Sequence, residues 1–273
     1  MSQWVHSLLV KTDGLSEAKT YIKMLTLFRI FYRGCAVPNI VFKNPNNKIK
    51  VFDICANGKV GNSKYSSKDT ELVECDDEYS KTYNIFLNEM TVFKYVYENI
   101  DSLLQTDYIG FISYRMSFPK IYVLRENAIN VIMENMQCSV FEQYCCWHEE
   151  NLIMRFLEQN LKNNSNFNDV LEYFNGRKMI LQNTFICHKN VFCEMVEYIL
   201  PLIDWCIEDM KLSGFMDSDI KVEREVRKYA YMMERIVGMW FWMQQPKNDI
   251  FNLDIDRYNI KPLWGKTLEN NIK

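Results

Sequence analysis

The 273-residue sequence contains little glycine and little proline, with nine and six residues respectively. This scarcity excludes collagen-like repeats and low-complexity disorder, which are rich in these residues. The sequence also has no strong excess of positively or negatively charged residues, because its formal net charge is only −3. Nothing in the bulk electrostatics therefore indicates a nucleic-acid-binding protein. No segment repeats at the period of a solenoid, so a repeat architecture is excluded as well.

Histidine is rare, with only His6, His148 and His188, and the sequence contains no Cys-x-x-Cys spacing. The residue types and spacings that form a zinc site are therefore missing. Of the nine cysteines, Cys145 and Cys146 are adjacent and the other seven are scattered through apolar segments, which predicts buried free thiols in a cytoplasmic protein. Three acidic groups are candidates for a hard cation, but they lie in loop-like or tail segments and are interpreted as surface acids or helix caps: Asp76-Asp77, Asp217-Ser218-Asp219 and Asp254-Ile255-Asp256. We predict no metal site.

The sequence also lacks a long uninterrupted hydrophobic run. Its first ten residues have no basic flank, and their apolar stretch is too short for a signal peptide. The most apolar later segment, 192–207, contains Glu194, Glu197, Pro201 and Asp204. These residues predict a buried helix and exclude a membrane span. We expect a cytoplasmic protein that contacts a membrane at most from its surface.

The most informative segment that is present runs from Asp107 to Arg115, with the sequence DYIGFISYR. Its first part is a short, continuous run of aromatic and β-branched residues, which is typical of a strand buried on both faces of an α/β sheet. Ligands of open α/β sheets bind beyond the carboxyl ends of the strands, so Ser113, Tyr114 and Arg115 are candidate site residues. Arg115 can bind a phosphate or carboxylate through two hydrogen bonds, although a surface arginine beside a packing tyrosine gives the same pattern.

The hydrophobic periodicity predicts an α/β fold whose second half is mostly helical. Residues 1–245 are expected to form a single domain, on which a C-terminal tail of residues 246–273 packs through Phe251, Tyr258 and Trp264. Helices are predicted over 16–32, 85–100, 139–161, 192–210 and 221–244. Strands are predicted over 4–10, 108–112, 121–124 and 179–187, with two more between 37 and 51. The segment 129–133 suits either a helix or a strand. The segment 57–80 is predicted to form a long surface loop.

Three further groups of polar residues have two interpretations each. His148 lies about one helical turn after Glu142, Gln143 and Tyr144. It is either a functional residue, acting as a general base or a phosphate ligand, or a residue that makes a structural hydrogen bond. Gln182-Asn183-Thr184 lies within an apolar strand and either satisfies neighbouring backbone groups or binds substrate hydroxyls. The late helix carries a stripe that indicates either a solvated charged face or a site for a diphosphate-bearing substrate: Arg224, Arg227, Lys228, Tyr231, Glu234 and Arg235.

Several of these pieces stand in the order of a known family. Asn88-Glu89-Met90-Thr91, followed by the segment 107–115, resembles an Asn/Glu-Leu-Thr segment followed by a strand end of the form D-Y-hydrophobic-G-L-x-H-Y-R-R. That pattern marks the glycosyltransferase-like domain of capsular and lipopolysaccharide synthesis proteins. Ser113 and Met116 stand where the pattern has its histidine and its second arginine. Three later segments are similar to the Y-E-Q-Y…H block, the N-M-F-I strand and the E-R-L helix of that domain: 140–148, 182–186 and 233–235.

The resemblance covers residues 84–242 and implies a GT-A-like nucleotide-sugar fold. It implies transfer of a sugar from a nucleotide donor, expected to be UDP-linked, to a glycan, lipid-linked or protein-linked hydroxyl in polysaccharide biosynthesis, with no other cofactor. Where GT-A enzymes carry a metal-binding Asp-x-Asp, this sequence has Ser-Tyr-Arg, so transfer is predicted to be metal-independent, with Arg115 near the leaving diphosphate. Glu234 is the candidate general base. The predicted substrate-binding residues are Asn88, Glu89, Ser113, Tyr114, His148, Asn183 and Arg235.

Two alternatives to an active glycosyltransferase also fit the sequence. A descendant of the same fold that has lost catalysis would bind glycans or nucleotides, or act in assembly, and Ser113 in place of the motif histidine favours this alternative. A generic α/β domain whose motif matches arise by chance is the second. Nucleotide binding separates the two sugar-related hypotheses from the generic domain, and nucleotide release separates the enzyme from its inactive descendant.

Overall fold

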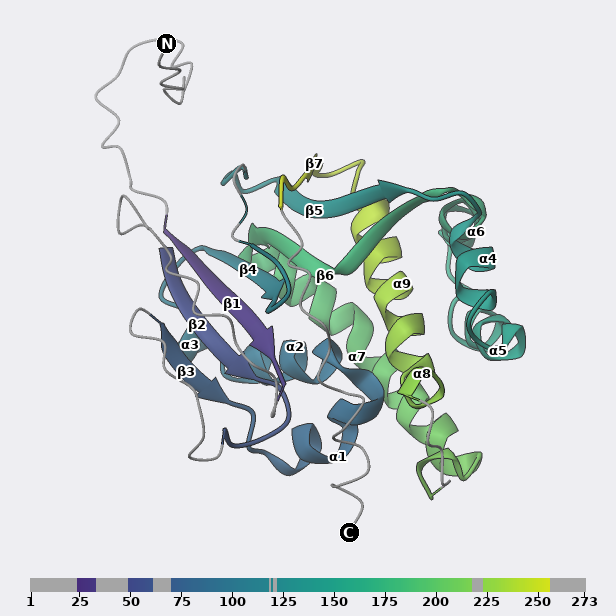
Figure 1. Cartoon of the computed structure of the whole chain (residues 1–273). Helices are drawn as coiled ribbons and strands as arrows, with labels where there is room; N and C mark the ends of the chain where they lie inside the picture. Colours follow the sequence, from purple (N-terminus) through teal and green to yellow (C-terminus); the bar gives the residue numbers. More distant parts are fainter. Residues whose placement is uncertain are drawn as a thin grey trace, which may run out of the picture.

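The computed structural model describes residues 24–32, 49–60, 70–117, 119, 122–217 and 223–255. Within them, a mixed seven-stranded sheet has the strand order β3-β2-β1-β4-β6-β5-β7 (Figure 1). β3, β2, β1 and β4 are parallel to one another, β6 runs antiparallel to β4 and β5, and β7 is parallel to β5. The strands are β1 (Leu25–Phe31), β2 (Ile49–Cys55), β3 (Glu71–Glu74), β4 (Tyr108–Ser113), β5 (Ala128–Asn135), β6 (Lys178–His188) and β7 (Asp249–Asn252).

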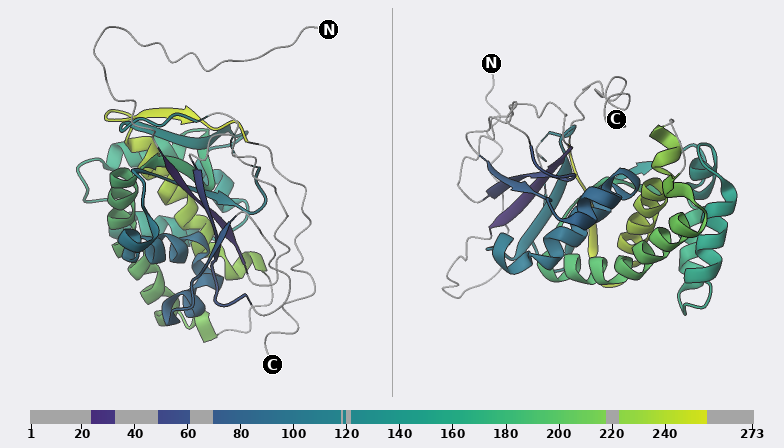
Figure 2. Two further views of the ribbon diagram at one scale, coloured as in Figure 1. Left: turned by 90° about the vertical axis from the view of Figure 1, so that its left-hand side faces the viewer. Right: turned by 90° about the horizontal axis from the view of Figure 1, so that it is seen from below.

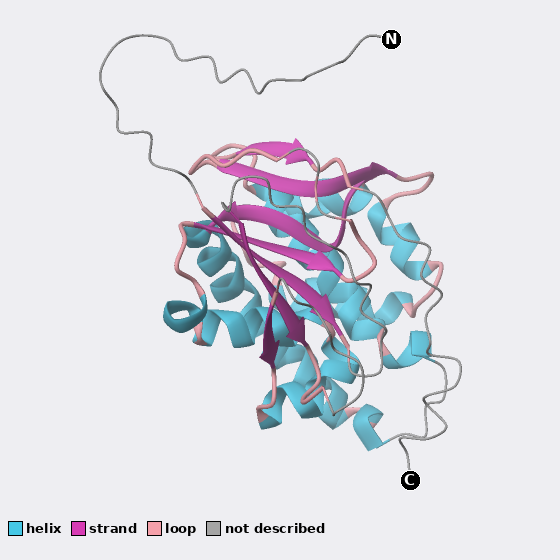
Figure 3. Cartoon of the chain, turned by 60° about the vertical axis from the view of Figure 1, so that its left-hand side comes forward, coloured by secondary structure: helices cyan, strands magenta, loops and turns pink. Residues whose placement is uncertain are grey.

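Helices gather on one face of this sheet and extend beyond it (Figures 2 and 3). α7 packs on β4 and β6, α2 packs against α7, and α9 packs on β6, while α4 and α6 form an outer layer against α9. No helix in the described ranges is long and apolar enough to cross a membrane. The helices are α1 (Glu78–Leu87), α2 (Glu89–Glu98), α3 (Ile100–Leu103), α4 (Val140–Cys145), α5 (Glu150–Asn160), α6 (Phe167–Asn175), α7 (Lys189–Leu212), α8 (Glu223–Val226) and α9 (Lys228–Met243).

β4 is the central strand of the core, as its continuous apolar sequence predicts. It is buried along its length except at the half-buried Ser113. The ring of Phe111 lies 4.9 Å from Phe93 of α2 and 5.2 Å from both Phe185 of β6 and Phe192 of α7, measured between ring centroids. This aromatic cluster joins the sheet to the helical layer, and it confirms the predicted strand over 108–112.

Gly110 of β4 allows the neighbouring strands to pack closely. A Cβ atom at this position would lie 2.8 Å from side-chain carbons of Leu27 and Ile186, and 3.1 Å from the carbonyl oxygen of Phe185. We expect Gly110→Ala to lower the free energy of unfolding by about 1–3 kcal/mol, because these neighbours must shift to admit the methyl group. Urea unfolding followed by circular dichroism measures the change, and an unaltered midpoint would contradict the close packing.

The structure overturns the predicted helix over 16–32 wherever it is described. Leu25–Phe31 form β1, and all seven side chains are buried. Arg29 interrupts the apolar run and lies opposite Asp53 of β2. Its Nε and Nη2 atoms donate to the two carboxylate oxygens at 2.5 and 2.6 Å. Thr70 also donates to Asp53 through its hydroxyl, at 2.6 Å. Helical spacing of the apolar residues was misleading here because burial on both faces produces no strand-like alternation.

Three predicted helices are divided in the structure. The segment 85–100 is divided at Asn88, whose φ of 48° cannot continue an α-helix, so α1 ends before this residue and α2 begins after it. The segment 139–161 is divided into α4, which begins with a capping box at Ser139, and α5. The segment 221–244 is divided at Arg227 into α8 and α9. The helix predicted over 192–210 is confirmed as α7, which continues through Pro201.

The strand predictions have mixed outcomes. The strand over 179–187 is confirmed as β6, and 129–133 belongs to β5. The strand over 121–124 is wrong for its described residues, because the Asn130 side chain takes both backbone groups of Val123, accepting from its N–H at 2.7 Å and donating to its carbonyl at 2.9 Å.

Two strands and two helices lie in places where the sequence predicted none. β3 occupies part of the predicted loop 57–80, and β7 occupies part of the predicted C-terminal tail. α3, apart from its first residue, and α6 lie outside the predicted helices. The strand over 4–10 and the tail residues 256–273, with Tyr258 and Trp264, fall outside the described residues. The single domain over 1–245 stays a prediction.

Candidate functional site

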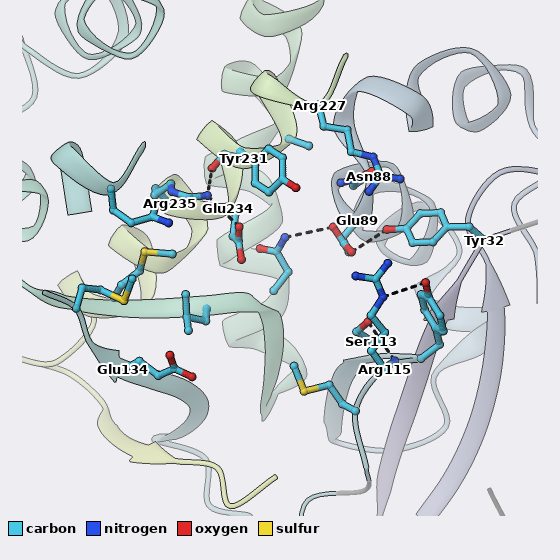
Figure 4. Close-up of a pocket in the computed structure, with 18 residues that line it drawn as sticks. Tyr32, Asn88, Glu89, Ser113, Arg115, Glu134, Arg227, Tyr231, Glu234 and Arg235 are labelled. Carbon is cyan, nitrogen blue, oxygen red and sulfur yellow. Dashed lines mark hydrogen bonds and ion pairs between the residues drawn. The ribbon is translucent and has the colours of Figure 1, made fainter. Parts of the chain in front are cut away.

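A cavity of about 580 Å³ opens at the carboxyl ends of β1 and β4 (Figure 4). α2, the β5–β6 pair, α4 and the first half of α9 complete its wall. Eight of the nine predicted site residues line it, and His148 does not. The lining consists of Tyr32, Asn88, Glu89, Ser113, Tyr114, Arg115, Met116, Glu134, Met136, Gln143, Met179, Leu181, Asn183, Arg227, Ala230, Tyr231, Glu234 and Arg235.

The tip of β4 is held against β1. The backbone N–H of Tyr114 donates to the carbonyl of Ile30 at 2.9 Å, which extends the parallel pairing by one residue. Nε of Arg115 donates to the Tyr114 hydroxyl at 3.0 Å, and its guanidinium lies 5.2 Å from the centre of that ring. The ring of Tyr32, directly after β1, meets the Tyr114 ring edge-on at 6.4 Å. These contacts place Arg115 at the edge of the sheet where an α/β fold binds its ligand.

Two asparagines with left-handed backbone conformations line the same cavity. Asn88 and Asn183 both have φ of 48°, and they are the described non-glycine residues with positive φ. Asn88 separates α1 from α2. Asn183 lies where the pairing of β5 with β6 shifts register, so that Val131 faces Phe185 while the next residue faces Leu181. A register shift of this kind changes the direction in which neighbouring side chains point. Unfavourable backbone conformations, such as those of Asn88 and Asn183, are also concentrated at functional sites.

Glu89 connects the two sides of the cavity. The Tyr32 hydroxyl donates to one of its carboxylate oxygens at 2.7 Å, and Nδ2 of Asn183 donates to the other at 3.5 Å. Burial raises the pKa of Glu89, with a further increase from the Glu234 carboxylate, while the Tyr32 hydrogen bond and the Arg227 charge oppose that rise. Burial and the Glu89 carboxylate also raise the pKa of Tyr32 well above its usual value, so this hydroxyl remains a donor.

A buried arginine holds the carboxylate of Glu234. Nη1 of Arg235 donates to Glu234 at 2.9 Å and to the carbonyl of Tyr231 at 2.6 Å, while Nη2 donates to Gln143 of α4 at 2.5 Å. Arg235 is only 3% exposed, so the ion pair is shielded from solvent on the side away from the cavity. The carboxylate of Glu234 is therefore fixed in position at the cavity wall.

His148 lies behind the cavity wall. Its ring packs between those of Tyr144 and Tyr231, with 5.0 Å between centroids in each case. Tyr231 lines the cavity, whereas His148 supports it from the other side. The structure therefore separates His148 from the other predicted site residues, and its role as a substrate ligand stays an untested prediction.

Several residues of the cavity wall are not among the predicted site residues. Tyr32 falls within the segment predicted as a helix, although it follows an apolar run as Tyr114 does. Arg227 and Tyr231 belong to the charged stripe of the late helix, and the apolar periodicity of that helix does not indicate which face meets the cavity. Glu134 lies near the end of β5, directly after the segment 129–133, for which the sequence suits either a helix or a strand.

The described residues contain no cluster of three or more histidine, cysteine, aspartate or glutamate side chains that could hold a metal ion. The three glutamates that line the cavity come from different elements, namely α2, β5 and α9. The cations in the wall are instead Arg115, Arg227 and Arg235.

Comparison with known proteins supports the fold. No family model matches the sequence, and no curated protein matches it. Among solved structures, the chain is similar to the apo structure of the bifunctional glycosyltransferase WbbM, with a TM-score of 0.55 and 12% sequence identity. The similarity covers 89% of this chain and 48% of that one, so this chain spans about half the length of the WbbM chain. The two share a mixed α/β, GT-A-like fold, as the sequence predicted.

Proposed function

We propose that this chain is a glycosyltransferase that moves a sugar from a nucleotide-sugar donor, expected to be UDP-linked, to a hydroxyl of a glycan, lipid-linked or protein-linked acceptor. The observation that carries the proposal is the cavity at the carboxyl ends of β1 and β4, whose wall combines arginines with carboxylates inside a GT-A-like fold. Its volume of about 580 Å³ is in the range of small-molecule sites.

Two arginines of the cavity wall lie beside Tyr32 and Tyr114. The guanidinium of Arg227 lies 5.7 Å from the centre of the Tyr32 ring, and that of Arg115 lies 5.2 Å from the Tyr114 ring. The two rings are in edge contact, so the two arginines flank the same aromatic pair in the cavity wall. A diphosphate suits this region, since guanidinium groups bind phosphate oxygens through paired hydrogen bonds. We propose that these arginines offset the charge of the leaving diphosphate without a metal ion.

Glu234 is the proposed general base. In the transfer step its carboxylate removes the proton of the acceptor hydroxyl, and the acceptor oxygen forms a bond to the anomeric carbon of the sugar. The bond between that carbon and the diphosphate oxygen breaks, and the diphosphate leaves with the bonding electrons beside Arg115 and Arg227. Arg235 keeps the carboxylate in place through the 2.9 Å ion pair.

Arg115→Ala is expected to lower the rate of nucleotide release from a UDP-sugar by about 10²–10³-fold, the usual effect of removing one charge-stabilising donor. The assay incubates the purified protein with a panel of UDP-sugars, with and without chelator, and measures free UDP. Release by the unaltered protein should persist in chelator. Arg125→Ala is the matched control, because Arg125 is half exposed and pairs with Asp249 outside the cavity. Equal loss in both variants would contradict the role of Arg115.

A non-catalytic descendant of the fold is the second candidate, favoured by Ser113 in place of the motif histidine. The same assay separates the two, because this candidate binds the nucleotide sugar without releasing UDP. Absence of binding to every nucleotide would contradict both candidates.

A further inference from the structure

Glu89 differs from Glu234, the other half-buried carboxylate of the cavity wall. Glu234 is paired with Arg235, whereas Glu89 has no ion-pair partner in the part of the chain that the structure describes. Its two side-chain hydrogen bonds come from neutral donors, the hydroxyl of Tyr32 directly after β1 and the amide of Asn183 in β6. Each donor holds a different oxygen of the carboxylate, so the two bonds together orient it; Figure 4 shows Glu89 beside Tyr32.

The carboxylate of Glu89 retains capacity for more hydrogen bonds. An ionised carboxylate offers about four lone-pair positions, and Tyr32 and Asn183 each use one. Glu89 is half-buried and lines the cavity, so the remaining positions are accessible to a ligand there. The ligand group must donate hydrogen bonds. A phosphate is excluded at this point because it would add negative charge beside an unpaired carboxylate.

We propose that Glu89 accepts hydrogen bonds from two neighbouring hydroxyl groups of the nucleotide-sugar donor. The inference rests on the proposed function and specifies which chemistry of the donor this part of the wall recognises. Two adjacent hydroxyls match the two oxygens of a carboxylate, as the two N–H groups of an arginine do. A nucleotide sugar carries such diols on its ribose and on its sugar. Both lie next to the diphosphate, in keeping with the position of Glu89 close to Tyr32 and Arg227.

Isothermal titration calorimetry tests the proposal with three ligands: UDP, 2′,3′-dideoxyuridine diphosphate and UDP-glucose. If the ribose supplies the diol, UDP binds about 10–100-fold more tightly than the dideoxy nucleotide, the usual effect of losing hydrogen bonds to a charged group. If the sugar supplies it, UDP and the dideoxy nucleotide bind equally, and UDP-glucose binds more tightly than UDP by a similar factor. In either case Glu89→Gln, which keeps the shape of the side chain, removes the preference.

Glu158→Gln is the matched control, because Glu158 is an exposed glutamate of α5 outside the cavity wall. It should leave every preference unchanged. Equal binding of the three ligands, or a preference that survives Glu89→Gln, would overturn the diol subsite alone. No binding of any of them would overturn the proposed function and the subsite with it. The comparison of ligands on the unaltered protein does not depend on whether a variant folds.

The pH dependence of the ligand preference gives a second test of Glu89. Only the ionised form of Glu89 accepts from both hydroxyls, so the preference should weaken as the pH falls. Because burial raises the pKa of Glu89, this weakening should begin at a higher pH than for an exposed glutamate. The charged and titratable groups that face Glu89 are Tyr32 after β1, Arg227 before α9 and Glu234 within α9. UDP and its dideoxy counterpart share the same phosphates, so the ratio of their affinities cancels phosphate titration. A ratio independent of pH would count against Glu89.

Discussion

Asp53→Ala is expected to lower the free energy of unfolding by about 3–5 kcal/mol, because it leaves a buried guanidinium without its carboxylate partner. Arg29 is 1% exposed and Asp53 is fully buried, and two short hydrogen bonds join them across β1 and β2. The substitution also removes the acceptor of the Thr70 hydroxyl. Urea unfolding with linear extrapolation measures the loss.

The exposed pair of Arg125 and Asp249 supplies the control. Both side chains are about half exposed, so Asp249→Ala should change the free energy of unfolding by less than about 1 kcal/mol. A double variant, Arg29→Met with Asp53→Leu, removes both charges and should recover most of the stability, since an apolar pair of similar size avoids the cost of desolvation. An Asp53→Ala protein as stable as Asp249→Ala would contradict the buried pair.

This buried pair also explains why β1 could not be predicted from sequence. A charged residue within an apolar run favours a surface helix, whose polar face would carry Arg29. The partner that makes its burial possible lies 24 residues later, on a strand that pairs with β1. Local periodicity contains no information about that pairing. β4 was predictable because no charged residue interrupts its apolar run. Its buried residues also span nearly the whole strand, so the apolar run and the strand have almost the same ends.

The candidate site shows the same division between local and non-local information. Ser113–Arg115 could be placed at a site because a polar tip after a buried strand has a general meaning in α/β folds. The hydrogen bond that links Tyr32 to Glu89 joins segments 57 residues apart, and the contact of Asn183 with Glu89 spans 94 residues. His148 had the residue type of a site residue but lies behind Tyr231. Residue type and order selected eight of the residues that line the cavity, whereas the direction of the α9 side chains depends on the packing of α9 against β6.

Register irregularity is a further feature that sequence could not reveal. Gln182-Asn183-Thr184 was recognised as polar residues in an apolar strand, with backbone support and substrate binding as equal alternatives. The structure places Asn183 in a shift of register, with a left-handed backbone, next to Glu89. No pattern in a single sequence specifies where two paired strands lose their register.

Glu234→Gln is expected to lower the turnover number for sugar transfer by about 10²–10⁴-fold, the contribution of a positioned general base. Because the substitution keeps the size of the side chain, the Michaelis constant for the donor should change little. Steady-state UDP release with a saturating acceptor measures both constants, and circular dichroism checks that the variant is folded.

Two further variants separate proton transfer from simple charge support. Arg235→Lys keeps a positive charge beside Glu234 but cannot bond Gln143, Tyr231 and Glu234 together, so it should lower turnover less than Glu234→Gln. Glu134→Gln changes another carboxylate of the wall, one that is exposed and lies on β5. If Glu234 is the base, only Glu234→Gln removes turnover while donor binding persists. If Glu134→Gln has the larger effect on turnover, the base is on β5, and the acceptor approaches from that side of the cavity.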